Sequence, residues 1–531
     1  MLVDFRTLED GALLEADLCV IGAGAAGITL GRELIGSGLT VCLVESGGLE
    51  PEADTQDLYH GDVIGRPYYP LDITRLRHFG GSTNHWVGWC TPLDASDFEP
   101  KPWLPHSGWP FPRSELEPHY ERAQRVCELG PYVYDDRLWD RFEVEAPDLN
   151  PQRLEFCFLQ ESPPTRFGEV YRAELAQAED VTVLLHANVT DIRTNDAAAI
   201  VEHAVIRTLD GKAGRITARA FVVACGGIEN ARLLLASNRD IEPAGLGNRN
   251  GLVGRFFMEH LELVSAIVAS DDPYNLIQTF GRRTRDGVLY RIGFRLGEDL
   301  RAREGLLNGS AELAYVPDPE AGASAAAALW RDLRRGRVSD EWAARVWRVI
   351  TDLDGMAGYA YRLLTTRRGD PWPTSVARLQ LNALSEQAPN PESRITLSPT
   401  ERDALGMSRP QLDWRLTATD RRTIEVLTTT IGAEFARLGL GRVRLEDWLS
   451  QGGDAWPPDL HGGHHHMGTT RMAEDPRSGV VDRDGRVHAV ANLYIAGSSV
   501  FPTGGHASPT LTIVALALRL AAHLKGQYGA R

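Results

Sequence analysis

The sequence predicts an α/β protein of two domains whose segments interleave along the chain. At 531 residues the chain is too long for one simple core. Between residues 17 and 45, an apolar run, a glycine-rich turn, an apolar-periodic segment and a second apolar run follow one another, as in a βαβ unit. The same order of apolar run, glycine turn and helical segment recurs over 220–235. These observations favour a parallel sheet with crossover helices in the first domain.

The turn of the first unit has the pattern G-x-G-x-x-G. Gly22 permits a tight turn, Gly24 lets the backbone approach a pyrophosphate, and Gly27 lets the helix pack on the strand. An anion would then lie at the helix N-terminus, where free N–H groups and the helix dipole favour it. Glu45 ends the second strand and would accept from ribose hydroxyls. The pattern predicts a dinucleotide site, and a buried βαβ unit without a ligand is the alternative.

Composition narrows the class of protein. With 43% hydrophobic and 24% charged residues, the chain is a folded globular protein rather than a disordered one. No apolar run reaches the roughly eighteen residues of a membrane span, and the N-terminus lacks signal-peptide features, so we expect a cytoplasmic protein. The six cysteines lack C-x-x-C spacing, which predicts buried thiols rather than disulfides or zinc ligands. The net charge of −16 argues against nucleic acid; it can favour a cationic substrate, although solubility explains it equally well.

Two further stretches combine glycines, small polar residues and histidines. Residues 77–89 read RHFGGSTNHWVGW, which suits a loop against a flat ligand, although an ordinary polar turn has the same composition. Residues 461–472 read HGGHHHMGTTRM, and GSSVFPTGGHASPTLT follows at 497–512. The histidine cluster suggests a metal, but no carboxylate or cysteine joins it and glycines break any helical face. We therefore predict no metal site there.

The glycine turn, the GGSTNHW loop and the tail together resemble the glucose–methanol–choline (GMC) family of FAD-dependent flavoproteins. The resemblance covers both ends of the chain and roughly 180–260, and leaves the middle weakly matched. It implies bound FAD, with contacts from Gly22, Gly24, Gly27, Glu45, Gly81, Ser82, Asn84, His85, Val189, Gly497, Pro509 and Thr510. It also implies a Rossmann-like FAD-binding domain of 1–100, 151–262 and 455–531, a covering segment of 101–150, and a substrate-binding domain of 263–454 with an antiparallel sheet.

His85 matches the position that carries a covalent bond to the isoalloxazine 8α carbon in family members with attached flavin. A neutral imidazole nitrogen is a competent nucleophile. The resemblance therefore implies FAD attached through His85; the alternative is a neutral histidine that hydrogen-bonds within the loop.

One segment of the middle block, from Ala323 to about Thr366, is rich in Arg and Trp. Such a helical segment can lie on a membrane, but Asp and Glu are interspersed and interrupt its apolar face. We expect it to be a solvated cover over the substrate site.

In the resemblance, the catalytic histidine lies three residues before the glycine of the G-T-x-x-M run, which is His465. Alcohol oxidation needs a base for the hydroxyl proton while hydride leaves the same carbon for flavin N5, and histidine suits this role because its ordinary pKa lies near the working pH. The family's second active-site residue, Asn or His, precedes the proline of the last motif; here Ser508 stands there. Ser508 can contact substrate or cap a helix that starts at Pro509, and His506 is the candidate for a displaced second imidazole.

The resemblance thus implies an FAD-dependent oxidoreductase that converts a CH–OH group of a sugar, glycoside or other polyol-like alcohol to a carbonyl. One alternative is a redox-neutral lyase or isomerase with structural FAD, and another is an inactive flavin-binding protein. The sequence leaves oxygen, a quinone and a redox protein open as electron acceptors.

Overall fold

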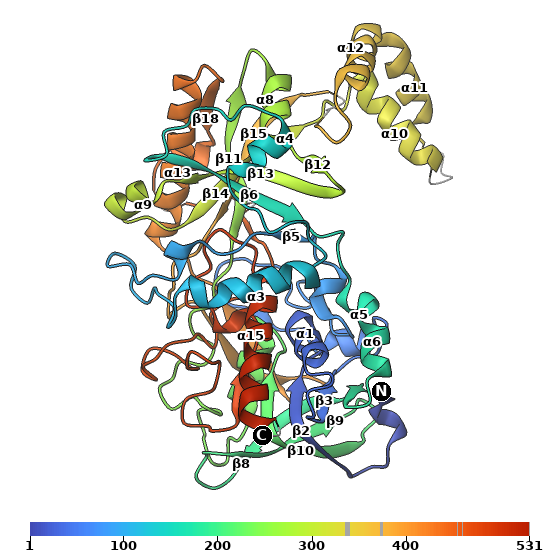
Figure 1. The fold of residues 1–531 in the computed structure, drawn as a ribbon, viewed down its shortest axis with the longest axis vertical. Helices are drawn as coiled ribbons and strands as arrows, with labels where there is room; N and C mark the ends of the chain where they lie inside the picture. The colour runs from blue at the N-terminus through green and yellow to red at the C-terminus, as the bar shows by residue number, and fades with distance from the viewer. Residues whose placement is uncertain (335–339, 372–374, 454, 459, 530–531) are drawn as a thin grey trace.

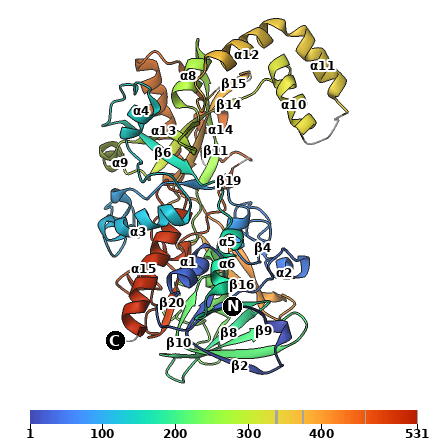
Figure 2. The same ribbon diagram turned by 45° about the vertical axis from the view of Figure 1, so that its right-hand side comes forward.

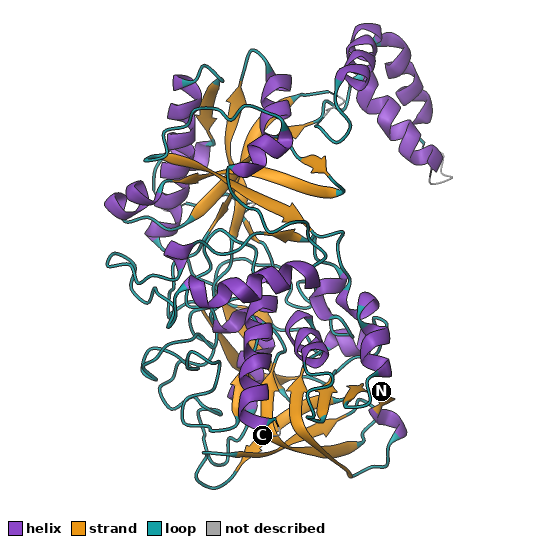
Figure 3. Ribbon diagram, in the orientation of Figure 1, coloured by secondary structure: helices purple, strands orange, loops and turns teal. Residues whose placement is uncertain are grey.

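The computed structural model describes residues 1–531 except 335–339, 372–374, 454, 459 and 530–531. Two lobes stack along the long axis, each built on one large β-sheet, and both termini lie in the lower lobe (Figures 1 and 2). Strands form the centre of each lobe and helices surround them (Figure 3). The predicted combination of a Rossmann-like domain and an antiparallel domain is confirmed.

The lower lobe contains an eight-stranded sheet in the order β1-β7-β3-β2-β10-β9-β8, with β20 paired to β10. Its pairs are parallel except for those of β9 with β10 and β8. The predicted βαβ unit is β2–α1–β3, and β3 is buried along its whole length, as parallel strands covered on both faces are. The strands are β1 (Leu2–Asp4), β2 (Ala12–Ile21), β3 (Val41–Val44), β7 (Val181–Leu185), β8 (Asn188–Thr194), β9 (Val201–Arg207), β10 (Ala213–Val223) and β20 (Leu493–Ile495).

Helices of the lower lobe flank this sheet, and α15 packs against both α1 and α3. Helix α1 follows the glycine turn near residue 24, and α15 lies near the other end of the sequence. Buried residues of both helices belong to the same hydrophobic core. These helices are α1 (Ala25–Glu33), α2 (Ala53–Asp57), α3 (Arg113–Val126), α5 (Phe167–Val170), α6 (Arg172–Gln177), α7 (Gly227–Ala236) and α15 (Thr510–Tyr528).

The upper lobe contains a nine-stranded antiparallel sheet in the order β18-β11-β15-β14-β13-β6-β5, with β12 on β13 and β19 on β11. Helix α13 covers one face, and its Leu427, Ile431 and Phe435 join the core of this lobe. The strands are β5 (Trp89–Cys90), β6 (Leu154–Glu161), β11 (Leu261–Ala269), β12 (Arg283–Arg285), β13 (Val288–Leu296), β14 (Gly309–Val316), β15 (Arg378–Ser385), β18 (Arg442–Leu445) and β19 (His461–Gly462). The helices are α4 (Arg137–Phe142), α8 (Pro273–Phe280), α9 (Glu298–Glu304), α13 (Ala418–Arg437) and α14 (Asp447–Ser450).

The sheets cut across the predicted domain boundaries in several places, since β5 and β19, predicted in the FAD-binding domain, also belong to the upper sheet. Strand β6 pairs with β13 in the upper sheet, although 151–262 was assigned to the FAD-binding domain. Strands β16 (Arg394–Arg402) and β17 (Ser408–Asp413) form a three-stranded sheet with β4 (Asp62–Val63), and β16 packs on α7 of the lower lobe. A strand's pairing partner can lie hundreds of residues away, so spacing along the chain does not reveal which sheet the strand joins.

Helices α10 (Gly322–Arg334), α11 (Trp342–Thr351) and α12 (Leu353–Thr365) project from the upper lobe and pack mainly on one another (Figures 1 and 2). The expected cover over the substrate site is wrong, since none of these residues lines the cavity described below. The segment leaves the sheet where Val316 pairs with Arg378, whereas the cavity lies at the other end of the strands, near Glu262 and Leu384.

Two further observations concern cysteines and membranes. All six cysteines are free; five are buried and Cys225 is half-buried. Among the described residues, no helix is both long and apolar enough to span a bilayer.

Candidate active site

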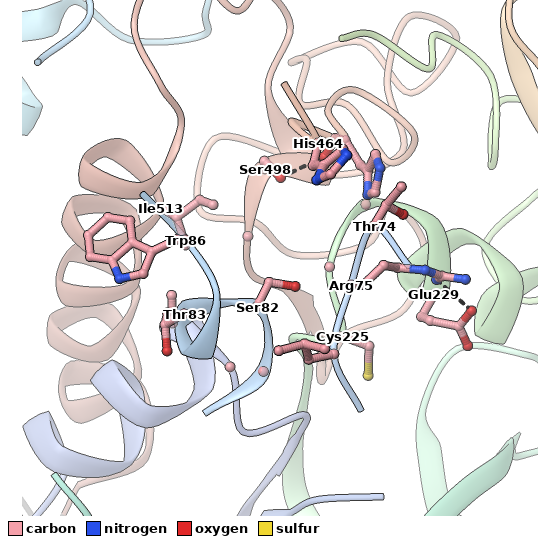
Figure 4. Close-up of a pocket in the computed structure, with 18 of the residues that line it drawn as sticks. Thr74, Arg75, Ser82, Thr83, Trp86, Cys225, Glu229, His464, Ser498 and Ile513 are labelled. Carbon is pink, nitrogen blue, oxygen red and sulfur yellow. Dashed lines mark hydrogen bonds and ion pairs between the residues drawn. The ribbon is translucent and has the colours of Figure 1, made fainter. Parts of the chain in front are cut away.

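A cavity of about 660 Å³ lies between the two sheets. The glycine turn, the 81–89 loop and the start of α15 form its lower wall, β11 and β13 contribute to its upper wall, and the 461–466 segment lies beside both. Figure 4 shows Trp86 and Ile513 on one side of the pocket, Arg75 and Glu229 on the other, and His464 above them. No residue of 101–150, the predicted covering segment, lines it.

Three helices begin at this cavity without a side-chain cap. The N-cap residues of α1, α7 and α15 are Gly24, Gly226 and Pro509, and no side chain of the described residues accepts a cap hydrogen bond from the first N–H groups of these helices. The first N–H groups of each helix are therefore available to a ligand, and their dipoles favour an anion. Arg77 borders the same cavity with a buried Nε that has no partner among the described residues. This donor set fits the pyrophosphate and polar ring edges of FAD.

The three glycines of the turn have two different structural roles. Gly22 has φ +104°, and a Cβ there would lie 2.6 Å from the Ala224 oxygen. A Cβ on Gly27 would lie 1.8 Å from the Gly22 oxygen. A Cβ on Gly24 would meet no protein atom within 4 Å. Gly22 and Gly27 are therefore required for chain packing, whereas Gly24 opens onto the cavity.

Most predicted cofactor residues border the cavity. Those that line it are Gly22, Gly24, Glu45, Gly81, Ser82, His85, Val189, Gly497, Pro509 and Thr510. Gly27 lies behind the turn, and Asn84 instead donates to the Phe79 oxygen at 2.9 Å and closes its own loop. Glu45 accepts from the backbone N–H groups of Ala23 at 3.0 Å and Gly47 at 2.9 Å, so it also orders the turn.

The ring of His465 contacts a second histidine, His260, through a 2.8 Å Nδ1–Nδ1 hydrogen bond. His260 Nε2 lies 2.7 Å from the Gly505 oxygen, which can only accept, so the His260 proton is on Nε2 and its Nδ1 accepts. Nδ1 of His465 must then carry the donated proton, which leaves His465 Nε2 unprotonated. Burial lowers the pKa of His465 well below the usual range, and His260 lowers it further. His465 is therefore a neutral imidazole with a free basic nitrogen.

The Glu259 carboxylate forms hydrogen bonds with the backbone of both histidines. Its Oε2 accepts from the backbone N–H groups of His260 at 3.1 Å and His465 at 2.9 Å, and its Oε1 accepts from the Tyr68 hydroxyl. Tyr68 also lies 3.0 Å from His466 Nε2. Burial raises the pKa of Glu259 to about 8, while burial lowers that of His260 to about 4. This network fixes the backbone that carries the two histidines.

Comparison with known proteins identifies the family. A family model described as FAD dependent oxidoreductase matches residues 17–353, and one described as GMC oxidoreductase matches residues 389–517. The chain belongs to the GMC oxidoreductases and binds FAD.

Full-length relatives of this GMC oxidoreductase are distant. It is 26% identical to 6'''-hydroxyparomomycin C oxidase from Streptomyces lividus, over 96% of this chain and 92% of the relative. It is 24% identical to the fructose dehydrogenase large subunit from Gluconobacter japonicus, over 96% of this chain and 97% of that one. The solved structure of a fungal aryl-alcohol oxidase matches 98% of this chain and 100% of its own with a TM-score of 0.56, at 14% identity. That last match concerns the fold alone.

The two remaining predicted catalytic residues have different surroundings. Ser508 lines the cavity, but it is not the N-cap of α15: Pro509 holds that position, with helical φ −72° and ψ −18° and no side-chain cap. Neither Ser508 nor any other described side chain makes a cap hydrogen bond to the first turn of α15. His506 does not line the cavity; it is buried with Nε2 3.6 Å from Asp94 Oδ2, and burial lowers its pKa.

Sequence reasoning missed several cavity residues of this GMC oxidoreductase. On the lower wall, Arg75 Nη1 bonds Glu229 Oε1 at 2.8 Å, and Arg77 Nη1 bonds Glu229 Oε2 at 3.5 Å, as Figure 4 shows for Arg75. Burial raises the pKa of Glu229, but Arg232, Arg75 and Arg77 together lower it to about 2. On the upper wall, Glu262 and Arg291 were missed as well. For Glu262 and Arg291, the sequence shows only an acid or an arginine between apolar strand residues, a pattern that many solvent-facing strands share.

Proposed function

We propose that this GMC oxidoreductase oxidises a CH–OH group of a sugar, glycoside or other polyol-like alcohol to a carbonyl, with His465 as the base. The hydrogen-bond chain from Gly505 through His260 to His465 carries this proposal, because it leaves His465 Nε2 unprotonated at the cavity. The names of the two full-length relatives, an oxidase and a dehydrogenase of fructose, support the substrate class.

FAD supplies a hydride acceptor when it is bound along the uncapped starts of α1, α7 and α15. The protein's own contribution is acid–base and positional. His465 Nε2 takes the hydroxyl proton of the substrate, and His260 keeps the ring oriented by accepting from its Nδ1. The low pKa of His465 keeps it unprotonated at neutral pH, ready to act as base. Glu259 holds the backbone N–H of His465 and so fixes the position of the base.

Ser508 and His85 have separate proposed roles. Ser508 donates one hydrogen bond to the substrate oxygen, which supports orientation but not proton removal. Replacing Ser508 with Ala should slow flavin reduction by about tenfold or less, the loss of one net hydrogen bond. His85 forms the covalent link to FAD; its ring is exposed to the cavity and burial lowers its pKa, which keeps it a neutral nucleophile. Yellow colour should remain on acid-denatured wild-type protein and leave the His85→Ala protein, whereas complete release from wild type would disprove the link.

Anaerobic mixing of the purified protein with a panel of alcohols and sugars tests the oxidation directly. Bleaching of the flavin with formation of one carbonyl per flavin is the expected result. A redox-neutral lyase or isomerase would convert substrate with the flavin still oxidised, and an inactive flavin-binding protein would do neither. Re-oxidation of the bleached enzyme with oxygen, a quinone or a redox protein then identifies the electron acceptor. A cytoplasmic location is part of the same proposal, supported by the six free cysteines.

A further inference from the structure

Glu262 lies on β11 at the end of the strand that borders the cavity. Its neighbours Leu261 and Leu263 are buried on the opposite face, so strand alternation turns the Glu262 carboxylate toward the cavity. A Cβ on Gly463 would lie 2.7 Å from Glu262 Oε1 and 2.8 Å from His465 Nδ1. The carboxylate and the proposed base are therefore close neighbours.

The Glu262 carboxylate has no cationic partner in the described part of the chain, where no Lys, Arg or His nitrogen lies within 4.0 Å of it. Arg291 also lines the cavity, but its Nη1 bonds both oxygens of Glu312 at 3.0 and 3.1 Å. The same guanidinium lies 3.5 Å from the centre of the Trp89 ring. Burial raises the pKa of Glu262, although His461 and Arg291 oppose that shift. Glu262 is therefore a cavity carboxylate without an ion-pair partner among the described residues.

An enclosed carboxylate without a cation is unfavourable, and a bound cation offsets that cost. Tyr69 adds an aromatic ring to the same cavity, and aromatic rings attract ammonium groups. We propose that Glu262 binds an ammonium group of the substrate, so that the alcohol oxidised at His465 carries a protonated amine close to the reacting carbon. This rests on the proposed alcohol oxidation and narrows its substrates to amino alcohols and amino sugars. The net charge of −16 favours the approach of such a cation.

Binding can be measured without turnover by reducing the holoenzyme with dithionite under anaerobic conditions, because a reduced flavin accepts no further hydride. Glucosamine, N-acetylglucosamine and glucose are the probes, titrated calorimetrically into the reduced enzyme. They share a ring and differ at one carbon as ammonium, neutral amide or hydroxyl. We expect glucosamine to bind about 10- to 100-fold more tightly than the other two, the usual worth of a hydrogen bond to a charged group.

The variant Glu262→Gln keeps the size of the side chain and removes its charge, so it should bind all three sugars with similar affinity. The matched control is Glu161→Gln on β6, which removes one carboxylate near Arg291 but does not line the cavity. The control should retain the wild-type preference. Thermal melting and flavin absorbance of both variants verify that they fold and hold FAD.

Equal binding of the three sugars by wild type, or an unchanged preference in Glu262→Gln, would overturn the ammonium site. Either result leaves alcohol oxidation intact, since bleaching of oxidised enzyme by neutral alcohols is measured separately. Conversely, a Glu262-dependent preference for glucosamine together with no bleaching by any alcohol would refute the oxidation and keep the ammonium site.

Discussion

The cavity region and the three projecting helices both have an unusual distribution of side chains. Ionisable groups are buried around the cavity, whereas large apolar groups are exposed on the helices. His465 lines the cavity, and Glu259, which bonds its backbone N–H from behind the cavity wall, is fully buried. On the projecting helices, Trp347 is 67% and Leu364 is 87% exposed, and neither α11 nor α12 has a buried residue. Burial of an ionisable group costs folding free energy, whereas an exposed apolar side chain contributes little, because it is in water in the unfolded chain as well. Only the first group is tied into a hydrogen-bond network that prepares a base.

Both regions are attached to the antiparallel sheet of the upper lobe. The cavity lies at the strand ends near Glu262, and the projecting helices leave from the opposite ends, at Val316 and Arg378. Strands β14 and β15 separate the two regions by about eight residues, or roughly 25 Å at the rise of an extended strand. The cavity residues thus lie at one end of this sheet, and the projecting helices lie at the other. Changes at the cavity should therefore alter flavin chemistry, and changes on the helices should not.

The largest effect is expected at the glycine turn. Gly24→Val places a side chain in the open space at the start of α1, so the protein should fold but lose most of its FAD. Flavin absorbance per protein and circular dichroism measure the two properties. Gly27→Val is the matched control: its Cβ would collide with the Gly22 oxygen, so this variant should lose folded structure as well. A fully yellow Gly24→Val protein would contradict the assignment.

The next effect concerns the base. His465→Ala should slow anaerobic flavin reduction by about 10² to 10⁴, the usual contribution of a positioned base. His260→Phe should have a smaller effect of the same sign, because the ring of His465 loses the partner that fixes its proton on Nδ1. His464→Ala is the control, since His464 also lines the cavity but does not bond to His260. Stopped-flow absorbance gives the rates, and a wild-type rate in His465→Ala would show that another residue is the base.

The third prediction concerns how the free energy of unfolding depends on pH through Glu259. The pKa of Glu259 is raised from 4.5 to about 8 by burial, so the folded protein holds a proton that the unfolded chain releases across this window. This contribution to the free energy of unfolding is complete below about pH 4.5 and is lost as the pH rises toward 8, at up to about 1.4 kcal/mol per pH unit. Urea unfolding of wild type and Glu259→Gln at several pH values should show a shallower decline in the variant. Parallel curves would mean that Glu259 is ionised in the folded protein.

The smallest effect is expected on the projecting helices. Trp347→Gln and Leu364→Gln replace exposed apolar side chains, so the free energy of unfolding should change by less than about 0.5 kcal/mol. Flavin content and the rate of flavin reduction should equal those of wild type. A slower reduction in either variant would show that the projecting helices influence the cavity.

The β2–α1–β3 unit, its glycines and the acid at Glu45 could be predicted from the amino-acid sequence alone. These features follow from local spacing, because a tight turn, a helix start and a strand end each involve neighbouring residues. The family resemblance, which rests on short motifs, also predicted His465 and Ser508 as active-site residues, and both line the cavity.

Contacts between residues far apart in the sequence became visible only in the folded structure. His260 lies 205 residues before His465, so nothing in their spacing predicts the hydrogen bond that fixes the tautomer. Strand β6 joined the upper sheet through its pairing with β13, and the Arg-rich and Trp-rich segment turned away from the cavity because of where it leaves β14. Local patterns specify local backbone geometry, whereas contacts between distant segments depend on how the whole chain packs.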